Sequence, residues 1–582
     1  MSAQYVPRCA ASPAPRSSLS SEPKLISELQ LELRLEKQTV STTEQCSEAE
    51  SEDQIEYPTG LRLGLITLAL CLSVFLVALD NTIIATAIPK ITDQFDSLED
   101  VGWYGSAYLL TTAAFQLLYG RLYSFLSMKW VYMGAISVFE LGSLICGISR
   151  NSKTLIVGRA IAGIGSSGIF TGALIIASTA VPMRKRPVYT GIIGAVFGIA
   201  NPAGLLMGGA FADKVSWRWC FYINLPIGDR PFVVALLDLC CIGGITLLVI
   251  TFFFKTAGAT RKSQTMSLWE RINQFDPFGT IVFIPAVVCL LLALQWGGSK
   301  YPWSNGRIIA LLMLFGVLIS AFIAVQIWKQ DMGTCPPRIL KKRNMMAGTF
   351  FALCLGSSYF IMVYFLPIWF QAIKGVSAVK SGIDNLPLIL SLVISILMAG
   401  AVVSAAGYYT PFMISSSVLM TVGAGLLSML SVTSGHAHWI AYQAIYGLGV
   451  GLGLQQPLIA VQTVLSAEDI PTGTSLIMFM QTLGGALFIS VGQNVFSNKL
   501  TSGLAHQVPG VNPAVVLNAG ATSLQYAIDP SLLPAVLSVY NHALVSAFYV
   551  SIAMAGLSLV GSTAMEWKSI QDRDTKNGHE PN

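Results

Sequence analysis

The chain has 582 residues, of which 53% are hydrophobic and only 11% are charged. Soluble domains carry about 25% charged residues, so this composition excludes a water-soluble protein and makes the lipid bilayer the expected solvent. The net charge of +5 is small, and no basic patch is interleaved with aromatic residues, which argues against a nucleic-acid partner.

Fourteen apolar runs are long enough to cross a bilayer as helices, which takes about 20 residues each. They fall into a group of six, a pair and a second group of six. The predicted spans are 62–88, 101–123, 130–149, 155–181, 188–212, 231–254, 277–296, 307–329, 347–373, 382–406, 410–433, 438–465, 471–496 and 541–565. The predicted fold class is therefore an all-α polytopic membrane protein.

The segments around the spans complete the predicted domain organisation. Residues 1–60, rich in Ser, Glu and Gln, are expected to form a disordered cytoplasmic tail. The further divisions are an N-terminal six-helix bundle (61–254), a cytoplasmic loop with the extra helix pair (255–329), a basic cytoplasmic loop (330–346), a C-terminal bundle (347–565) with an outside loop (497–540), and a cytoplasmic tail (566–582). An even number of spans places both termini on one side, and the basic loops on that side make it cytoplasmic by the positive-inside rule.

Two opposite charges lie inside predicted spans, where a charged side chain is costly and usually functional. Asp80 lies in the first span and Arg159 in the fourth. At about 1.5 Å of rise per residue, their depths differ by only a few ångströms. We expect an ion pair, direct or linked by water, that titrates during turnover, with proton binding to Asp80 releasing Arg159. The alternative is a static pair that fixes helix packing.

Glu140 is a second carboxyl group near the middle of a predicted span, 130–149. It is a candidate for proton coupling or for contact with a substrate. The alternative is a protonated packing residue that hydrogen-bonds to a neighbouring helix.

Several amide side chains near mid-membrane depth are candidates for a substrate cavity. They are Asn201, Gln455, Gln456 and Gln481, with Gln116 somewhat lower in its span. An amide can orient a neutral or zwitterionic ligand without the cost of a fixed charge. The alternative for each of them is interhelical hydrogen bonding, which is common in membranes. Ser381 and Asp384 have the spacing of a capping box at the start of the tenth span, which predicts a structural role.

Three stretches carry a family resemblance: Leu79 to Pro89, the glycine-rich run that follows Arg159, and Trp217 to Gly228. Together they resemble the major facilitator superfamily and, more narrowly, its fourteen-span drug–proton antiporter branch found in fungi. The resemblance covers roughly residues 60–565. It implies two six-helix bundles, an inserted central helix pair, a central substrate cavity and alternating access.

The resemblance also indicates residues with a role in gating. In the loop after the second span they are Gly120 and Lys129, and in the fifth span they are Gly204, Gly208 and Gly209, whose small size lets helices approach closely.

The chain departs from the family pattern in three places. Ser124 stands where relatives carry an acidic residue that helps lock the inward gate, and Ser127 stands where they carry glycine. Leu205 replaces a common proline, although Pro202 lies just upstream. Residues 229–243 interrupt the passage into the sixth span, as a genuine insertion or as a gene-model artefact such as a retained intron.

Enzymatic chemistry has little support in the sequence. None of the five histidines, His436, His438, His506, His542 and His579, lies in mid-membrane or forms a metal-ligand set with carboxylates. The cysteines show no metal or disulfide spacing, and no nucleotide-binding loop is present. We therefore expect no catalytic residues, no metal and no cofactor, with the proton gradient as the energy source.

The sequence thus predicts a proton-coupled antiporter that exports small amphipathic organic compounds, such as toxins, secondary metabolites or drugs. The expected partners are the small-molecule substrate, protons and the lipid bilayer, and the expected oligomeric state is a monomer. The expected location is the cell membrane, with the vacuolar membrane as the alternative. Two other functions remain open: an uptake or exchange carrier for a metal chelate or nutrient, and a non-transporting membrane sensor.

Overall fold

The computed structural model describes residues 57–95, 100–225, 242–254, 275–298, 301–513, 515–517, 524 and 528–571. In these ranges the regular structure is helical, and the only β-type contacts are two isolated bridges, Gly297 with Tyr301 and Tyr408 with Ser569. The predicted tail 1–60 lies outside the described residues except for 57–60, and so does the interrupting segment 229–243 except for its last two residues.

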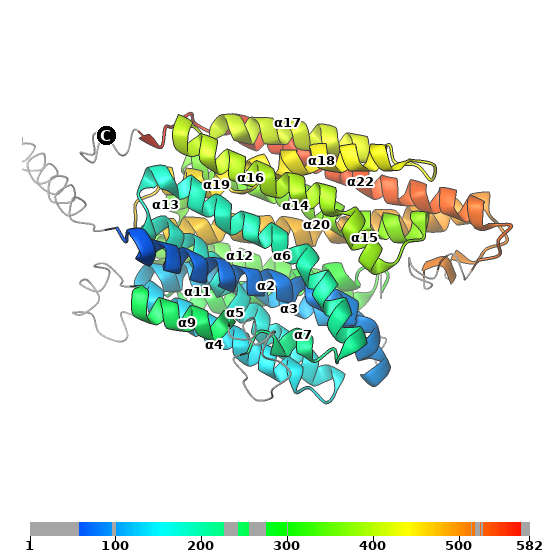
Figure 1. Ribbon diagram of the computed structural model, residues 1–582, viewed down its shortest axis with the longest axis horizontal. Coiled ribbons are helices and arrows are strands. Elements are labelled where there is room, and N and C mark those ends of the chain that lie inside the picture. Colours follow the sequence, from blue (N-terminus) through cyan, green and yellow to red (C-terminus); the bar gives the residue numbers. More distant parts are fainter. Residues whose placement is uncertain are drawn as a thin grey trace, which may run out of the picture. The chain divides into compact units, whose positions relative to one another are not determined.

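The N-terminal group of helices packs around α2 and α5 (Figure 1). Its helices are α2 (Gly60–Phe95), α3 (Val101–Phe125), α4 (Met128–Gly147), α5 (Ser152–Ala180), α6 (Arg186–Lys214), the short α7 (Trp219–Tyr222) and α9 (Ile242–Phe253), with the 3₁₀ turn η2 (Met183–Lys185) before α6. α2 contacts α6 and α9, while α5 contacts α3 and α4. Pro202 lies inside α6 without ending it.

The C-terminal group packs around α14, which contacts both α20 and α22. Its helices are α13 (Pro337–Leu340), α14 (Arg343–Lys374), α15 (Ala378–Asp384), α16 (Leu386–Ala406), α17 (Thr410–Leu427), α18 (His436–Leu454), α19 (Gln456–Val464), α20 (Ile470–Gln507) and α22 (Leu533–Ala564). α17 and α18 pack against each other, and α16 packs against α18.

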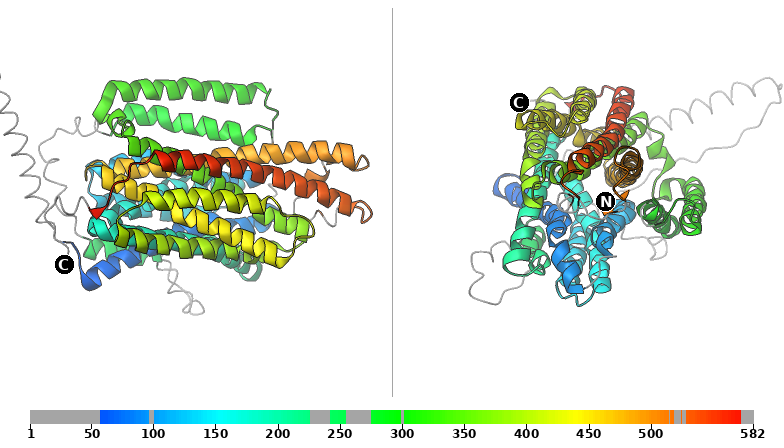
Figure 2. Two further views of the ribbon diagram at one scale, coloured as in Figure 1. Left: turned by 90° about the horizontal axis from the view of Figure 1, so that it is seen from above. Right: turned by 90° about the vertical axis from the view of Figure 1, so that its right-hand side faces the viewer.

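The extra pair, α11 (Pro277–Trp296) and α12 (Gly306–Lys329), forms a hairpin beside the two groups. Both views in Figure 2 show the pair at the edge of the helices. α11 contacts α3 and α20, whereas α12 is highly exposed and apolar, as expected for a helix that faces lipid. The 3₁₀ turn η3 (Gln330–Met332) follows α12.

Twelve described helices are long and apolar enough to cross a membrane. The predicted spans 101–123 and 231–254 are not among them. The first corresponds to α3, which is long enough but carries polar side chains that lower its hydropathy. The second is described only over residues 242–254, of which 12 form α9. A count of fourteen spans therefore stays a prediction.

The predicted outside loop 497–540 is too long. α20 continues to Gln507, and α22 begins at Leu533. Leu500 and Leu504 stand one helical turn apart and are fully buried, so the polar stretch between them continues the helix, whose apolar side packs toward α22.

The two groups of helices meet along two seams, one between α6 and α16 and one between α3 and α20. These pairs line the central region of the molecule, and the buried charges and the cavity lie next to them.

Candidate functional site

Asp80 on α2 and Arg159 on α5 form a direct ion pair in the N-terminal group. Arg159 Nη1 lies 2.6 Å from Asp80 Oδ2, and the two side chains are 0% and 1% exposed. The guanidinium also donates from Nε to the Tyr104 carbonyl oxygen at 2.8 Å and from Nη1 to the Asp80 carbonyl oxygen at 3.3 Å. One arginine therefore ties together α2, α3 and α5, and a change in the charge of Asp80 acts on all three helices.

Asn224 extends this pair toward α4. Its Nδ2 atom donates to Asp80 Oδ1 at 3.3 Å and to Ser143 Oγ at 3.1 Å, and Asn224 is completely buried. Sequence reasoning used the Trp217 to Gly228 stretch for recognition and assigned no role to Asn224. An amide within the otherwise apolar and aromatic run 219–227 was the signal that could have identified it.

Glu140 lies one turn before Ser143 on α4 and is half-buried. Its Oε1 atom is buried and has no hydrogen-bond partner among the described residues. Glu140 does not line the central cavity, so its predicted contact with a substrate finds no geometric support, and its role in proton coupling stays a prediction.

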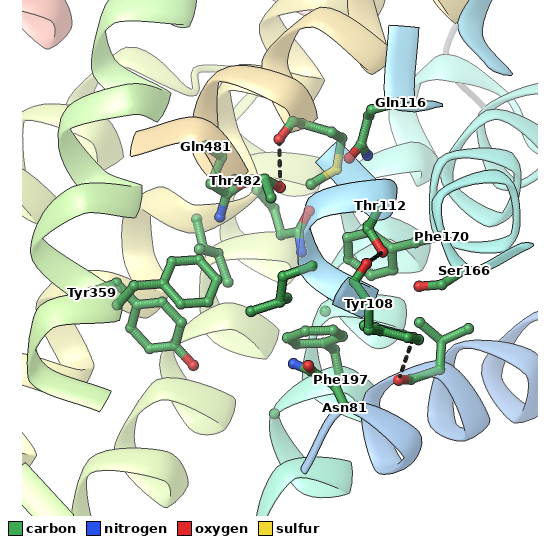
Figure 3. A pocket seen from close by; sticks show the side chains of 18 of the residues that line it. Asn81, Tyr108, Thr112, Gln116, Ser166, Phe170, Phe197, Tyr359, Gln481 and Thr482 are labelled. Carbon is green, nitrogen blue, oxygen red and sulfur yellow. Dashed lines mark hydrogen bonds between the residues drawn. The ribbon is translucent and has the colours of Figure 1, made fainter. Parts of the chain in front are cut away.

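A central cavity lies between the two groups of helices (Figure 3). With its mouth included, it holds about 940 Å³ of space not filled by atoms. The N-terminal group supplies Val77, Asn81, Tyr108, Leu109, Thr112, Gln116, Ser166, Phe170, Gly194, Phe197 and Gly198, and the C-terminal group supplies Tyr359, Phe360, Leu392, Leu454, Gln455, Met478, Gln481 and Thr482. Because both groups line it, a change in their relative position changes the cavity.

Three of the five predicted cavity amides line this space: Gln116, Gln455 and Gln481. Asn201 does not, because it lies about one turn beyond Gly198, the last α6 residue at the cavity wall. Gln456 does not either: it begins α19 and is 1% exposed, with its side chain buried away from the cavity. Asn201 and Gln456 therefore do not line this cavity, and a role for them in substrate binding stays a prediction.

Tyr108 on α3 separates the ion pair from the cavity. The Arg159 guanidinium carbon lies 4.4 Å from the centroid of the Tyr108 ring, a cation–π contact. The hydroxyl of Tyr108 donates to the Val77 carbonyl oxygen at 3.2 Å, and its ring lines the cavity (Figure 3). The sequence analysis did not identify Tyr108, because nothing in its sequence context distinguishes it from the other aromatic residues of the apolar spans.

The predicted gating glycine Gly120 lies at a close approach of the two groups. A Cβ atom at Gly120 would lie 2.0 Å from Ser475 Oγ, so only glycine lets α3 and α20 approach this closely. One turn further, the hydroxyls of Ser124 and Thr472 lie 3.3 Å apart. At this point the contact between the two groups is therefore made by two neutral hydroxyls.

The other predicted gating residues pack within or beside the N-terminal group. A Cβ atom at Gly204 would lie 2.1 Å from Thr82 Oγ1, and one at Gly208 would lie 2.2 Å from the Ile83 carbonyl oxygen, so both close the α2–α6 contact. A Cβ atom at Gly209 would meet only Val379 of α15, at 3.8 Å. Lys129 Nζ donates to the Thr251 carbonyl oxygen of α9.

The predicted capping box at Ser381 and Asp384 is wrong. The helix there, α15, begins after Ser377, whose side chain accepts from the backbone N–H of Lys380. Ser381 instead donates to the Pro367 carbonyl oxygen at 2.9 Å, and Asp384 pairs with Lys380 Nζ at 3.0 Å. The chain forms a separate short helix before α16, which moves the start of the helix four residues earlier and leaves the predicted cap in its middle.

The linker that joins α12 to α14, residues 330–342, is held by Arg338. Its guanidinium donates to Asp469 at 2.8 and 3.1 Å, just before α20, and to Asp331 at 2.9 Å. These hydrogen bonds raise the pKa of Arg338 above its ordinary value. Arg121 of α3 donates to the Met332 carbonyl oxygen at 2.9 Å. The linker is thus attached to both α3 and α20, close to Gly120.

Asp276, the N-cap of α11, binds the same linker at Thr334. It accepts hydrogen bonds from the side chain of Gln326 at 2.8 Å and from the backbone N–H of Thr334 at 2.9 Å, and it is fully buried. Burial alone would raise the pKa of Asp276, but these hydrogen bonds together with that of Gly279 outweigh it and hold the pKa below its ordinary value. The linker therefore connects the extra pair to the contact between the two groups.

Replacing Arg338 by glutamine is expected to loosen this linker. The pair with Asp469 is partly exposed, so its loss costs about 0.5–1 kcal/mol, which corresponds to an increase of about two- to five-fold in local hydrogen exchange. The increase should be confined to peptides covering 331–338 and 466–475. Replacement of the exposed Lys341 by glutamine removes the same charge and is the control; equal exchange in the two variants would contradict the assignment.

The comparisons with known proteins agree with this architecture. Residues 70–489 match the model of the Major Facilitator Superfamily. The chain is 55% identical over 530 residues to the "MFS-type efflux pump MFS1" of Arthroderma benhamiae, covering 90% of this chain and 96% of that protein. It is 51% identical to the "Efflux pump roqT" of Penicillium rubens (88% and 93% covered) and 48% identical to the "Efflux pump aflT" of Aspergillus parasiticus (90% and 99% covered).

Solved structures share the fold at low sequence identity. The proton:xylose symporter XylE superposes with a TM-score of 0.53 at 10% identity, covering 86% of this chain and 94% of XylE. The human organic anion transporter MFSD10 superposes with a TM-score of 0.51 at 12% identity, covering 85% and 100%. Together with the apolar helices and the central cavity, these matches show that the chain is a multi-pass membrane transporter that belongs to the Major Facilitator Superfamily.

Proposed function

We propose that this protein is a proton-coupled antiporter that exports small amphipathic organic compounds, such as toxins, secondary metabolites or drugs. The observation that supports it best is the buried ion pair of Asp80 and Arg159, one side chain away from a cavity lined by both groups of helices. A titratable group in this position can bias the packing of the helices that form the cavity wall.

The proposed cycle uses proton binding to Asp80 to shift a conformational equilibrium. Protonation removes the negative charge that holds Arg159 and weakens the link between α2 and α5. Arg159 keeps its contacts with the Tyr104 carbonyl and the Tyr108 ring, so its movement is passed to the cavity wall. Substrate and proton then favour different arrangements of the two groups, which is the requirement for exchange transport.

The names of the relatives support export as the direction, since several are called efflux pumps. The composition of the cavity argues against a charged substrate for the alternative, a carrier for a metal chelate or nutrient. None of the residues that line the described cavity is Asp, Glu, Lys, Arg or His, and such a ligand would be buried without a counter-charge.

We further propose a monomer in the cell membrane with both termini cytoplasmic; imaging of a tagged protein separates this location from the vacuolar membrane.

The test of export uses yeast that lacks its own efflux pumps. The chain is expressed with and without residues 229–243, and the accumulation of a panel of radiolabelled amphipathic compounds is measured with and without a protonophore. We expect lower accumulation of at least one compound and loss of this effect with the protonophore. Export that persists with the protonophore would refute proton coupling, and increased accumulation would favour uptake. Activity of the shortened chain alone would identify the interrupting segment as a lesion or artefact.

Replacing Asp80 by asparagine is expected to uncouple transport from the proton gradient. The change preserves the shape of the side chain but removes a charge-assisted hydrogen bond worth about 1.5–3 kcal/mol, so gradient-driven transport should fall by about tenfold or more. Transport into inverted vesicles under an imposed pH gradient measures this loss, and substrate exchange without a gradient checks that the variant is folded. Asp384→Asn is the control, since Asp384 pairs with Lys380 away from the cavity. A normal response of Asp80→Asn to the gradient would refute the role of Asp80.

A further inference from the structure

Two buried glutamines from different groups of helices line the cavity, and their carbonyl oxygens have no partner among the described residues. Gln116 belongs to α3 and is 2% exposed, and Gln455 lies between α18 and α19 and is 6% exposed. Both line the cavity, and the Oε1 atom of each has no hydrogen-bond partner among the described residues. An unsatisfied buried acceptor costs about 1–3 kcal/mol, so two of them at one cavity indicate a ligand that supplies donors.

The surroundings hold both amides in place. Gln116 Nε2 donates to the hydroxyl of Thr171 on α5 at 3.0 Å, which leaves its carbonyl end free. Gln455 reaches across the seam between the two groups: a Cβ atom at Gly194 of α6 would lie 2.2 Å from its Nε2 atom. Glycine at position 194 therefore makes room for an amide that comes from the C-terminal group, and the two glutamines line one space from different groups of helices.

The remaining walls of the cavity combine aromatic rings with uncharged polar groups. Phe170 and Phe197 of the N-terminal group lie with their ring centroids 5.1 Å apart, and Tyr359 and Phe360 of the C-terminal group lie 5.4 Å apart. Figure 3 shows Tyr359 on the side of the cavity opposite to Tyr108. Such rings favour a flat aromatic ligand, while a charged ligand would lose its hydration without gaining a counter-charge.

We propose that the cavity binds a neutral aromatic molecule carrying two hydroxyl or N–H donors, one donating to the carbonyl oxygen of Gln116 and the other to that of Gln455. The ligand then satisfies one acceptor from each group of helices and connects the two groups. This assignment rests on the proposed function, because it takes the same cavity as the substrate site. It adds a chemical rule: the molecule must be uncharged and must be a hydrogen-bond donor.

The test measures equilibrium binding to the purified full-length protein in lipid nanodiscs, without any gradient. The probes share one ring system and differ in one group: 2-naphthol (neutral donor), 2-methoxynaphthalene (neutral without a donor), 2-naphthoate (anion) and 2-naphthyl-trimethylammonium (cation). We expect 2-naphthol to bind at least about fivefold more tightly than the methyl ether, since one hydrogen bond to a buried acceptor is lost, and the two ions to bind more weakly still.

Variants identify the acceptors. 2-Naphthol has a single proton to donate and therefore satisfies one of the two acceptors. In Gln116→Met or in Gln455→Met, each of which retains an unbranched side chain of similar length, its preference over the ether should fall toward onefold. Gln456→Met is the matched control, because Gln456 is a buried amide at the neighbouring position that does not line the cavity, and it should keep the preference. Thermal unfolding of each variant shows whether it is folded.

Equal binding of 2-naphthol and its ether to the native protein would overturn the proposal, even if every variant fails to fold. A preference that survives in both Gln116→Met and Gln455→Met, tighter binding of either ion, or no saturable binding of any probe would overturn it as well. This outcome is separate from that of the proposed function: binding does not depend on a gradient, so the vesicle experiment with Asp80→Asn can fail while the donor preference holds.

Discussion

Replacing Arg159 by methionine is expected to lower the free energy of unfolding by about 3–5 kcal/mol, because it leaves the buried Asp80 without its counter-charge. The loss includes the hydrogen bond to the Tyr104 carbonyl, which joins α5 to α3. Reversible unfolding of the purified variant in mixed detergent micelles measures the change relative to the native protein.

The double variant Asp80→Asn with Arg159→Met separates the charge from the packing. It removes both charges, so it should recover more than half of the stability lost in Arg159→Met. Arg159→Lys retains the charge but cannot reach the Tyr104 carbonyl oxygen, Asp80 Oδ2 and the Asp80 carbonyl oxygen at once, and an intermediate stability is expected. A double variant no more stable than Arg159→Met would show that the ion pair is not the source of the loss.

Gly163 on α5 is the second position at which a small change should have a large effect. A Cβ atom there would lie 2.3 Å from the Tyr108 carbonyl oxygen and 2.2 Å from Thr111 Oγ1. The first contact is with the backbone, which cannot rotate away, so α3 and α5 must separate. We expect Gly163→Ala to cost about 1–3 kcal/mol and Gly163→Val to prevent folding.

Separation of α3 and α5 also breaks polar contacts between them. The hydroxyl of Thr111 donates to the Ala160 carbonyl oxygen at 2.8 Å, and that of Thr112 donates to the Gly163 carbonyl oxygen at 3.1 Å. The yield of monodisperse protein in size-exclusion chromatography and its melting temperature measure the effect. Gly425→Ala in α17 is the control: its Cβ atom would meet no atom within 4 Å, so stability should stay constant or rise slightly. Equal losses at both glycines would contradict the packing argument.

Sequence alone determined the features that depend on one residue or one run of residues. The hydrophobic runs predicted the helices and a membrane setting, because the apolar interior of a bilayer demands an apolar span wherever the chain crosses it. Depth along a helix follows from residue number, so the sequence also indicated that Asp80 and Arg159 lie at similar depths. In the structure, Arg159 Nη1 lies 2.6 Å from Asp80 Oδ2.

Tertiary structure decided which side chains share a space. Gln455 and Gln456 are neighbours in sequence, yet only Gln455 lines the cavity, because Gln455 lies at the break between α18 and α19 whereas Gln456 begins α19 and is buried. The segment that contains Leu500 and Leu504 is helical because α22 supplies a surface against which these two side chains are buried. Asn224 and Tyr108 gained their roles only when α2, α4 and α5 were packed around them. Hydropathy indicates which segments of the chain lie in the membrane. The direction in which a side chain points, and the residue it contacts, depend on the rotation of its helix and on neighbours distant in sequence.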